Sequence, residues 1–254
     1  MAREAKKSRG VRWRLWLWLA AAALLCVSTG MAALKVHRYA LTNAQFTLSA
    51  SRAGALQIQG LKNCSERKVA RVFATDFGAS IFAIPLAERR RRLLAIDWVA
   101  DASVARIWPD GLLVRIRERQ PVAFVPARSG ALLIDAAGVL LEPPPRAQFA
   151  FPVLVGVRED EPEEARGERV SAFLRFQKDM GDFAKDVSEV NVADPTNLRI
   201  VARVEGRALE LLMGGGDFAR HYGNFLSHYA EIQQGSPDVV TFDLRWDGHV
   251  TAKR

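Results

Sequence analysis

A run of 20 residues without a charged side chain, Leu15 to Leu34, constrains the fold of this chain more than any other stretch. As an α-helix rising 1.5 Å per residue, the run would be about 30 Å long, which matches the hydrocarbon core of a bilayer. Trp13, Trp16 and Trp18 lie at its beginning, and indole rings favour the headgroup region of a membrane. The run therefore predicts a transmembrane helix over residues 15–34.

The uneven distribution of charge predicts the direction of this helix. The chain has a formal net charge of +8, but residues 1–14 hold six basic residues and one acidic residue, which is +5, so the rest carries only +3. A body so close to neutral argues against nucleic acid binding. The basic excess predicts a cytoplasmic tail over residues 1–14 and an extracytoplasmic location for everything after Leu34, a single-pass type II topology.

A cleaved signal peptide is the alternative to an anchor. Gly30, Ala32 and Ala33 are small enough to form a cleavage site. The apolar run continues past them to Leu34, which favours an uncleaved anchor. A mature protein that begins near residue 34 would contradict the anchor.

Residues 94–123 hold the clearest β-sheet pattern. Val99–Trp108 is rich in Val, Ile and Trp, and residues 112–116 alternate as in a strand with one buried face. Between the two lies Pro109-Asp110-Gly111, in which proline presets φ, aspartate can close a turn and glycine supplies a positive φ. We therefore expect a β-hairpin that packs one face on helices. The side chains expected to face those helices are Val104, Trp108, Leu112, Val114 and Ile116.

Two helices are expected before this hairpin. Residues 35–54 have the composition of a polar connector, and residues 56–61 that of a short strand. Ser65 can N-cap a first helix, and Pro85 suits the first turn of a second. The Arg89–Arg92 run of the second helix could bind phosphate, but no aromatic or glycine-rich partner accompanies it, so we expect a solvated helix face.

The remaining sequence has the pattern of an α+β domain. Alternation typical of strands occurs at residues 131–140, 198–204, 209–213 and 239–246. Glu205-Gly206-Arg207 lies between the second and third of these runs and predicts a hairpin. One helix is expected from the acidic residues 159–164 to about Asp186, and another after Asp217, the expected N-cap.

No signature of an enzyme is found in this sequence. Gly214-Gly215-Gly216 lacks the Lys and Ser/Thr of a phosphate-binding loop. His221 and His228 could share a helix face, but a metal site needs more ligands. Ser171 and Ser227 belong to no nucleophile motif. We therefore expect no catalytic residue, no cofactor, no metal and no small-molecule substrate.

The expected order of strand, helix, helix, strand and strand over residues 55–123 resembles the POTRA domain of the bacterial cell division protein family FtsQ/DivIB. The residues that carry this resemblance are Gly60, Trp98, Arg106, Trp108, Pro109, Glu118, Arg119 and Pro121. Residues 124–254 resemble the β domain of the same family, whose Pro-x-Leu-x-Gly segment is similar to residues 152–156. The resemblance implies an α+β fold: a single transmembrane helix, a POTRA domain, and a second α+β domain with a mostly antiparallel sheet.

The resemblance also implies a role in cell division without catalysis. It implies a bitopic scaffold of the divisome in the bacterial inner membrane, enriched at the division septum, that links early and late division proteins. Such proteins bind partners of the FtsB and FtsL type and thereby regulate septal peptidoglycan synthesis. Two alternatives are a POTRA-containing factor for secretion or outer-membrane assembly, and a membrane-anchored envelope hydrolase.

The last strand pattern is the expected partner-binding site. In residues 241–248 the even positions through Trp246 are apolar and the odd ones polar, which indicates a half-buried strand. Such a strand can lie at a sheet edge and receive another strand, or it can complete the core, and periodicity alone does not choose. The resemblance favours the edge, because family members receive the FtsB segment by strand addition near this end. The candidate contact residues are Phe242, Leu244, Arg245, Trp246 and Gly248.

Overall fold

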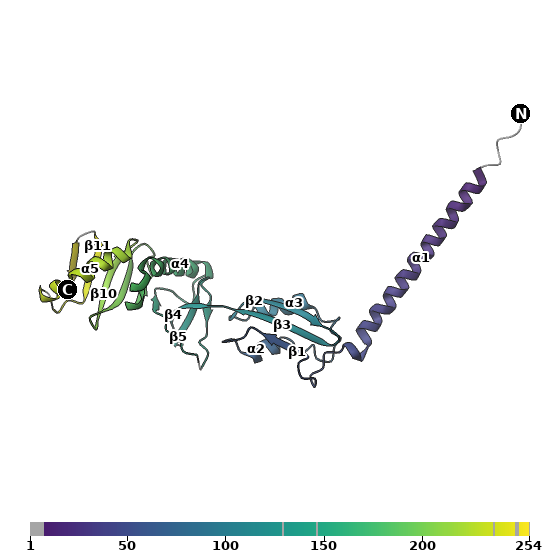
Figure 1. Cartoon of the computed structure of the whole chain (residues 1–254), viewed down its shortest axis with the longest axis horizontal. Helices are drawn as coiled ribbons and strands as arrows, with labels where there is room; N and C mark the ends of the chain where they lie inside the picture. Colours follow the sequence, from purple (N-terminus) through teal and green to yellow (C-terminus); the bar gives the residue numbers. More distant parts are fainter. Residues whose placement is uncertain (1–7, 129, 146, 236, 247–248, 254) are drawn as a thin grey trace, which may run out of the picture. The chain divides into compact units, whose positions relative to one another are not determined.

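The computed structural model describes residues 8–128, 130–145, 147–235, 237–246 and 249–253 (Figure 1). The chain forms two compact units. The first holds most of the chain up to Ile116, and the second holds most of the chain from Arg117 onward together with Lys62–Cys64 and Ala95–Ala100. Each unit is described by itself below.

A long helix, α1 (Ser8–Thr42), begins the first unit. Its segment Trp16–Thr42, of 27 residues, contains an 18-residue window with a mean hydropathy of 2.0, and the helix is long and apolar enough to cross a membrane. The helix does not break at Leu34, so the first eight residues of the stretch expected to be a polar connector are helical. The expected cytoplasmic tail lies partly outside the described residues, which begin at residue 8.

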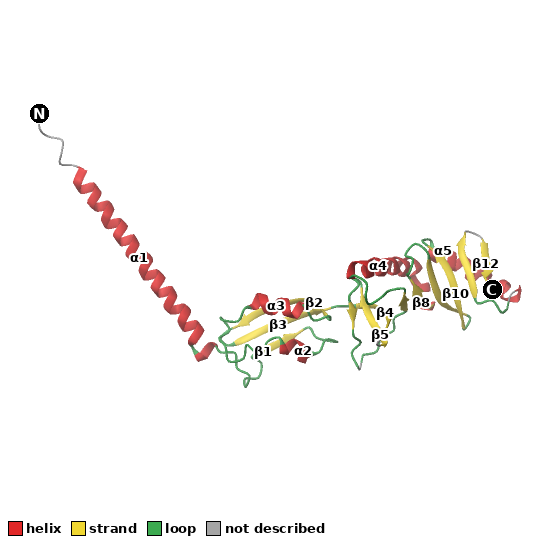
Figure 2. Ribbon diagram, turned by 180° about the vertical axis from the view of Figure 1, so that it is seen from behind, coloured by secondary structure: helices red, strands yellow, loops and turns green. Residues whose placement is uncertain are grey.

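After α1, the first unit has the order of elements that the sequence predicts (Figure 2). The elements are η1 (Ala44–Phe46), β1 (Leu56–Gln59), α2 (Glu66–Arg71), α3 (Leu86–Leu94), β2 (Val99–Ile107) and β3 (Gly111–Glu118). The three strands form a sheet of order β1-β3-β2, in which β1 pairs parallel with the central strand β3. The expected β-α-α-β-β order is thus confirmed.

The expected register is confirmed for β3 and wrong for the end of β2. Leu112 and Val114 are 0% exposed and Ile116 is 6% exposed, as the alternation predicts. Trp108, in contrast, is 69% exposed. It follows the last residue of β2, so it lies in the turn, where strand alternation no longer fixes the direction of a side chain.

The turn residues act differently from the expectation. Gly111 is not among the residues with a positive φ; a Cβ there would lie 3.2 Å from the Cβ of Ile107 and 3.4 Å from the carbonyl oxygen of Ala55. A side chain at this position would therefore be tightly packed, with Ile107 as its nearest neighbour. The carboxylate of Asp110 forms an ion pair with Arg52. It thus connects the turn to a loop distant in sequence.

Arg89 contradicts the expectation of a solvated face on α3. It is 7% exposed, and its Nε and Nη2 donate to the two carboxylate oxygens of Asp76 at 2.6 and 2.7 Å. The hydrogen bond with Asp76 raises the pKa of Arg89 above its ordinary value. Arg90 and Arg92 remain at the surface, where they pair with Asp101 and Glu88. One member of the arginine run is thus part of a buried ion pair that joins α3 to the preceding loop.

The second unit is built on one sheet of nine described strands with two long helices (Figure 2). Its elements are β4 (Pro121–Ala127), β5 (Gly130–Asp135), β6 (Leu140–Leu141), β7 (Val153–Val155), α4 (Glu163–Met180), η2 (Gly181–Asp186), β8 (Val187–Asn191), β9 (Leu198–Val204), β10 (Arg207–Gly214), α5 (Phe218–Gly235), β11 (Thr241–Trp246) and β12 (His249–Lys253). The strand order is β12-β11-β10-β9-β8-β7-β4-β5-β6. Five of the pairings are antiparallel and three are parallel, which confirms a mostly antiparallel sheet.

The apolar faces of α4 and α5 and one face of the sheet form a single core. The buried helix residues in it are Val170, Phe173, Phe176, Met180, Phe218, Tyr222, Phe225 and Tyr229. The four from α5 follow one another in the sequence at intervals of four, three and four residues, which is the spacing of one helix face. Burial and the nearby carboxylate of Asp186 raise the pKa of Tyr222, so its hydroxyl stays protonated and donates to Asp186.

The N-terminus of α5 is capped by a residue that the sequence did not indicate. The carboxylate of Asp179, in α4, accepts hydrogen bonds from the backbone N–H of Phe218 at 2.6 Å and of Ala219 at 3.3 Å. Asp217, the expected N-cap, instead pairs with Arg220. The cap thus joins the two helices.

Candidate partner-binding site

The strand expected at the sheet edge, β11, lies second in the sheet. It pairs parallel with β10 through Glu210↔Thr241 and its neighbours, and antiparallel with β12 through Phe242↔Ala252 and its neighbours. The edge is therefore formed by β12, because β12 ends the strand order of the nine-stranded sheet. The hypothesis that Thr241–Trp246 is itself the edge is wrong.

The candidate residues of β11 separate into a buried and an exposed pair. Phe242 is 1% and Leu244 3% exposed, and both belong to the core of the second unit. Arg245 and Trp246 are exposed, Trp246 by 69%. The side chains of this second pair lie largely at the surface, where a partner could contact them without unfolding the domain.

The predicted alternation fails at the end of β11. Asp243, expected on the wet face, is 5% exposed, and the pairing of β11 with β12 shifts register between Asp243 and Trp246. A β-bulge adds a residue to one strand and rotates the side chains that follow it. This shift explains why Trp246 is exposed although its parity is that of Leu244.

A salt bridge within β11 fixes the position of Arg245. Its Nε and Nη2 donate to the carboxylate of Asp243 at 2.8 and 2.6 Å. The hydrogen bond with Asp243 raises the pKa of Arg245 above its ordinary value. A bidentate pair of this kind presents the guanidinium in one orientation.

The edge strand β12 offers the backbone groups that a further strand needs. Successive residues of a strand direct their N–H and C=O groups to opposite sides, and β11 occupies only one side of β12. Val250 is 37% exposed and Thr251 is exposed. Gly248, the remaining candidate residue, lies outside the described residues.

A groove of about 430 Å³ lies beside these strands. One side is formed by α5, with His228 and Ile232, and the other by Leu244, Trp246 and Val250. Its lining combines apolar and polar side chains, which suits a peptide more than a metal or a phosphate group. The sheet edge, Trp246 and the groove thus lie together on one part of the second unit.

A turn dipeptide in the sequence, rather than apolar periodicity, indicates β12. Asp247-Gly248 lies between Trp246 and His249, which are partners in the β11–β12 pairing. An Asp-Gly dipeptide between two strand-like runs is a strong signal for a hairpin. The groove has no such signal, because α5 and β12 meet only in the folded domain.

Four of the resemblance residues belong to the first unit. Gly60 has φ +88°, and a Cβ there would lie 2.0 Å from the carbonyl oxygen of Ile116, so only glycine fits beside β3. The guanidinium of Arg106 donates to the carbonyl oxygens of Ile81 at 2.6 Å and Ile84 at 3.1 Å. Trp108 and Pro109 form the turn between β2 and β3.

The other four belong to the second unit. Trp98 is 6% exposed and donates from Nε1 to the carbonyl oxygen of Glu142 at 2.9 Å. The carboxylate of Glu118 accepts hydrogen bonds from the backbone N–H groups of residues 62–64 at 2.7–3.0 Å. Arg119 pairs with Asp135 at 2.8 Å. Pro121, also in this unit, begins β4. The bonds of Trp98, Glu118 and Arg119 stabilise the fold.

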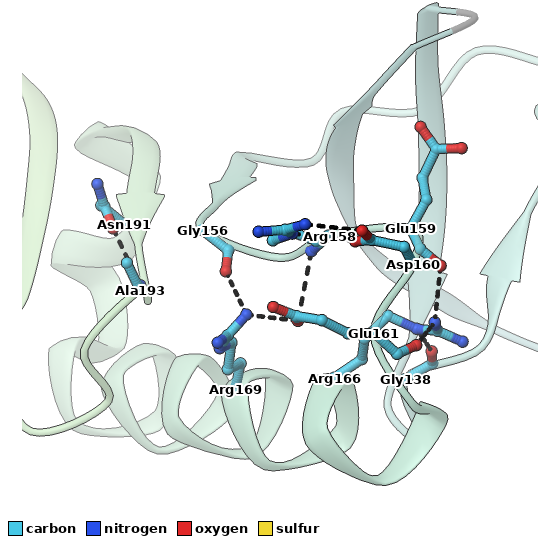
Figure 3. Close-up of polar contacts among 10 residues, drawn as sticks. All are labelled: Gly138, Gly156, Arg158, Glu159, Asp160, Glu161, Arg166, Arg169, Asn191 and Ala193. Atoms are coloured by element: carbon cyan, nitrogen blue, oxygen red, sulfur yellow. Dashed lines mark hydrogen bonds and ion pairs between the residues drawn. The ribbon is translucent and has the colours of Figure 1, made fainter.

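A second hollow, of about 590 Å³, lies between the end of β4 and the loop before α4. Three of its charged side chains bond to one another or to backbone: Arg158 pairs with Asp160 at 2.7 Å, and Glu159 accepts from the N–H of Arg128 at 2.6 Å. Figure 3 shows the neighbouring network, in which Arg169 donates to Glu161 and to the carbonyl oxygen of Gly156. These bonds secure the loop on α4.

The charges of this network also affect its acidic groups. The hydrogen bond from Arg169 is the largest cause that holds the pKa of Glu161 below its ordinary value. The hydrogen bond from Arg158 lowers the pKa of Asp160 in the same way. Within the described residues, no group of three or more His, Cys, Asp or Glu side chains could hold a metal ion.

Comparison with protein families and known proteins gives consistent results. Residues 51–119 match the family "POTRA domain, FtsQ-type", and residues 123–245 match "Cell division protein FtsQ/DivIB, C-terminal". "Cell division protein FtsQ" of Koribacter versatilis is 33% identical over 202 residues, which cover 77% of this chain and 58% of that protein. The protein of the same name from Geotalea daltonii is 24% identical over 241 residues, which cover 91% of this chain and 84% of that protein.

A solved structure is also similar, but only weakly. It is the major extracytoplasmic domain of the trans isomer of the cell division protein DivIB from Geobacillus stearothermophilus. Its sequence is 18% identical, the match covers 47% of this chain and 95% of that domain, and the TM-score is 0.25. This likeness adds nothing to the two family matches.

Proposed function

Because the chain belongs to the FtsQ/DivIB family of bacterial cell division proteins, we propose that it is a non-enzymatic scaffold of the divisome. In this proposal α1 anchors the chain in the inner membrane, and the two folded units act outside the cytoplasm at the division septum. The scaffold links early and late division proteins and regulates septal peptidoglycan synthesis through its partners. The matched region covers 58% of the length of the Koribacter relative, and the activities of a whole family member are therefore proposals for this chain.

The proposed partners are small bitopic proteins of the FtsB and FtsL type, and the proposed site is the β12 edge. The observation that carries this proposal is the side of β12 that no other strand in the described residues pairs with, next to the exposed Trp246. A peptide strand can pair with β12 through backbone hydrogen bonds, while its side chains contact Trp246 and Arg245 and enter the groove beside α5. Phe242 contributes indirectly, since it holds β11 on the core, while Leu244 belongs to the core and also lines the groove.

Calorimetric titration tests the site. The full chain in lipid nanodiscs is titrated with the extracytoplasmic segment of an FtsB-type partner, and Trp246→Ala is compared with the natural sequence. Burial of a large aromatic ring at the centre of an interface is worth about 2 kcal/mol or more, which is about 30-fold in Kd. Arg245→Glu should weaken binding as well, while Arg115→Glu on β3 is the matched control for the charge change. Unchanged affinity for both Trp246→Ala and Arg245→Glu would place the site elsewhere.

A pair of proline substitutions tests strand addition itself. Val250 and Thr251 are adjacent in β12, so one directs its N–H outward and the other directs it to β11. Proline removes the N–H in both cases. Strand addition predicts that one of Val250→Pro and Thr251→Pro abolishes partner binding while leaving the domain as stable as before. If neither variant loses affinity, the partner does not pair with β12.

A reporter tests the proposed orientation. The basic excess lies before Leu15, which favours an N-terminus in the cytoplasm. A reporter that is active only outside the cytoplasm, fused after Arg254, should therefore be active. Activity of a cytoplasm-specific reporter at the same position would reverse the topology.

A further inference from the structure

The segment that follows α1 is joined to the first unit by hydrogen bonds rather than by a free linker. Ser80, 5% exposed, donates from Oγ to the carbonyl oxygen of Ala40 in the last turn of α1 at 2.7 Å. The N–H of Ile81 donates to the carbonyl oxygen of Phe46 at 2.9 Å, and the N–H of Leu48 to that of Ala79 at 2.9 Å. The end of the apolar helix is thereby fixed against the loop that joins α2 and α3.

Four aromatic rings form a cluster at this joint, which we call the collar: Tyr39, Phe46, Phe82 and Trp108. Phe46 lies at its centre, with ring centroids 6.0 Å from Tyr39, 5.3 Å from Phe82 and 6.0 Å from Trp108. Phe46 is 8% exposed, but Tyr39 is 55%, Phe82 41% and Trp108 69% exposed. Three large rings around one buried ring thus remain in contact with the surroundings.

The position of the collar along α1 indicates what covers it. The apolar segment Trp16–Thr42 has 27 residues, which span about 40 Å as a helix, close to the full bilayer including headgroups. Tyr39 lies five residues beyond Leu34, about 7.5 Å farther along the axis, and therefore at headgroup depth. Phe46 contacts Tyr39, and Phe82 and Trp108 contact Phe46, so every ring of the collar lies within two ring contacts of Tyr39.

The chemistry of the collar also fits this depth. Tyr and Trp favour the membrane–water interface because their rings are apolar and their O–H or N–H groups polar. Lys35 and Arg38 are exposed on the same end of α1, where they can pair with anionic headgroups. The guanidinium of Arg106 lies 6.0 Å from the ring centroid of Phe82 and adds a third cation.

We propose that the collar is a membrane-docking surface: Tyr39, Phe82 and Trp108 enter the outer headgroup layer and hold the first unit against the bilayer. This inference depends on the proposed anchor, since α1 must cross the membrane for the collar to reach it. The proposed binding partner of the collar is the lipid surface. The C-terminal end of α1 and the β2–β3 turn are the parts of the first unit that contact it.

Fluorescence quenching by lipid tests the docking surface. The full chain is placed, one copy per nanodisc, in lipids that carry bromine on the acyl carbons nearest the glycerol, which quench nearby indoles. The emission of Trp108 is obtained by subtracting the fluorescence of the Trp108→Phe variant from that of the natural sequence. Trp246→Phe gives the matched control, since Trp246 is also 69% exposed but belongs to the other unit. We expect the Trp108 emission to lose most of its intensity, and Phe82→Gln to restore much of it.

The outcomes distinguish failure of the collar from failure of the anchor. The emission that remains in Trp108→Phe includes Trp13, Trp16 and Trp18 of α1, which bromine quenches if α1 lies in the bilayer. Quenching of these indoles without quenching of Trp108 beyond the level of Trp246 overturns the docking surface and leaves the anchor intact. Absence of quenching in α1 overturns both. With one copy per disc, quenching of Trp108 cannot come from a second copy or from another protein.

Discussion

Strands β3 and β11 have a similar apolar alternation in the sequence, but the structure keeps it fully only in β3. In β3 the residues Leu112, Val114 and Ile116 are all buried, while Arg115 is exposed. In β11 the polar Asp243 is buried and the apolar Trp246 is exposed. For Trp246 the difference lies in the pairing: β3 pairs with β1 in a regular register, whereas the pairing of β11 with β12 shifts between Asp243 and Trp246. Asp243 precedes this shift, and its buried carboxylate is paired with Arg245.

This comparison shows what alternation can and cannot predict. A regular strand repeats its side-chain direction every two residues, so burial on one face extends along its length. A bulge breaks that repeat, and bulges often lie where a surface presents side chains to a ligand. The regular strand belongs to the core of the POTRA domain, and the irregular one ends at the proposed partner site.

The largest expected effect tests the regular strand. Ile116→Asp places a carboxylate where the side chain is 6% exposed, and should reduce the free energy of unfolding by about 4 kcal/mol or more. Arg115→Asp, on the exposed face, should change it by about 0.5 kcal/mol or less. Urea unfolding of both variants, followed by hydrogen exchange of the β3 amides, measures the difference. Equal losses would mean that the register of β3 is different from the one described.

An intermediate effect tests the irregular strand. Leu244→Ala removes a core side chain that is 3% exposed and should cost about 2–5 kcal/mol. Trp246→Ala should cost about 0.5 kcal/mol or less, because its ring is mostly in solvent. Unbroken alternation would place both side chains in the core and predict large losses for both. Thermal unfolding of the two variants therefore decides whether the bulge turns Trp246 outward.

The smallest expected effect is a difference between the two units in how their stability depends on pH. The pKa of Glu161 is lowered, mainly by Arg169, and the two side chains are 17% and 23% exposed. A lowered pKa adds stability above the ordinary value of about 4.5 and loses it as the pH falls through the folded-state pKa. This contribution, on the order of 0.5–1 kcal/mol, belongs to the second unit alone.

The measurement is hydrogen exchange of β8 and β3 amides as the pH is lowered from 6 to 3, roughly the range over which carboxylates titrate. Glu161→Gln should flatten the acid dependence of β8 and leave that of β3 unchanged. Glu164→Gln, an exposed residue of the first turn of α4, is the control and should change neither. Identical acid dependence of β8 in Glu161→Gln and the natural sequence would contradict a stabilising pair.

Local patterns in the sequence were sufficient for much of the architecture. The uncharged run predicted the apolar part of α1, and the order of strand and helix patterns predicted the POTRA topology. The spacing of Phe218, Tyr222, Phe225 and Tyr229 predicted the buried face of α5. These features depend on the 3.6-residue and 2-residue periods of helices and strands, which the chain encodes over short distances.

Other features were decided only when distant segments met. The edge of the large sheet belongs to β12, because β12 pairs with β11 through a register that alternation alone does not contain. The cap of α5 comes from Asp179, about 40 residues away, and the partner of Arg89 is Asp76. Such side chains bond to residues that are distant in the sequence, so the residues adjacent to them in the sequence do not predict their partners.

The exposed residues show the same limit most clearly. The sequence singled out both Trp108 and Trp246. Periodicity placed Trp108 on a buried face, whereas Trp246, which has the parity of the apolar residues of its strand, was a candidate partner contact. The structure exposes each by 69%, one in the turn beside the end of α1 and one after a bulge near the sheet edge. Hydrophobicity marked both rings as apolar, but only the tertiary structure decided that each stays mostly at the surface. Trp108 lies in the turn beside Phe46, and Trp246 lines the groove after the register shift, because local backbone geometry directs both rings away from the cores.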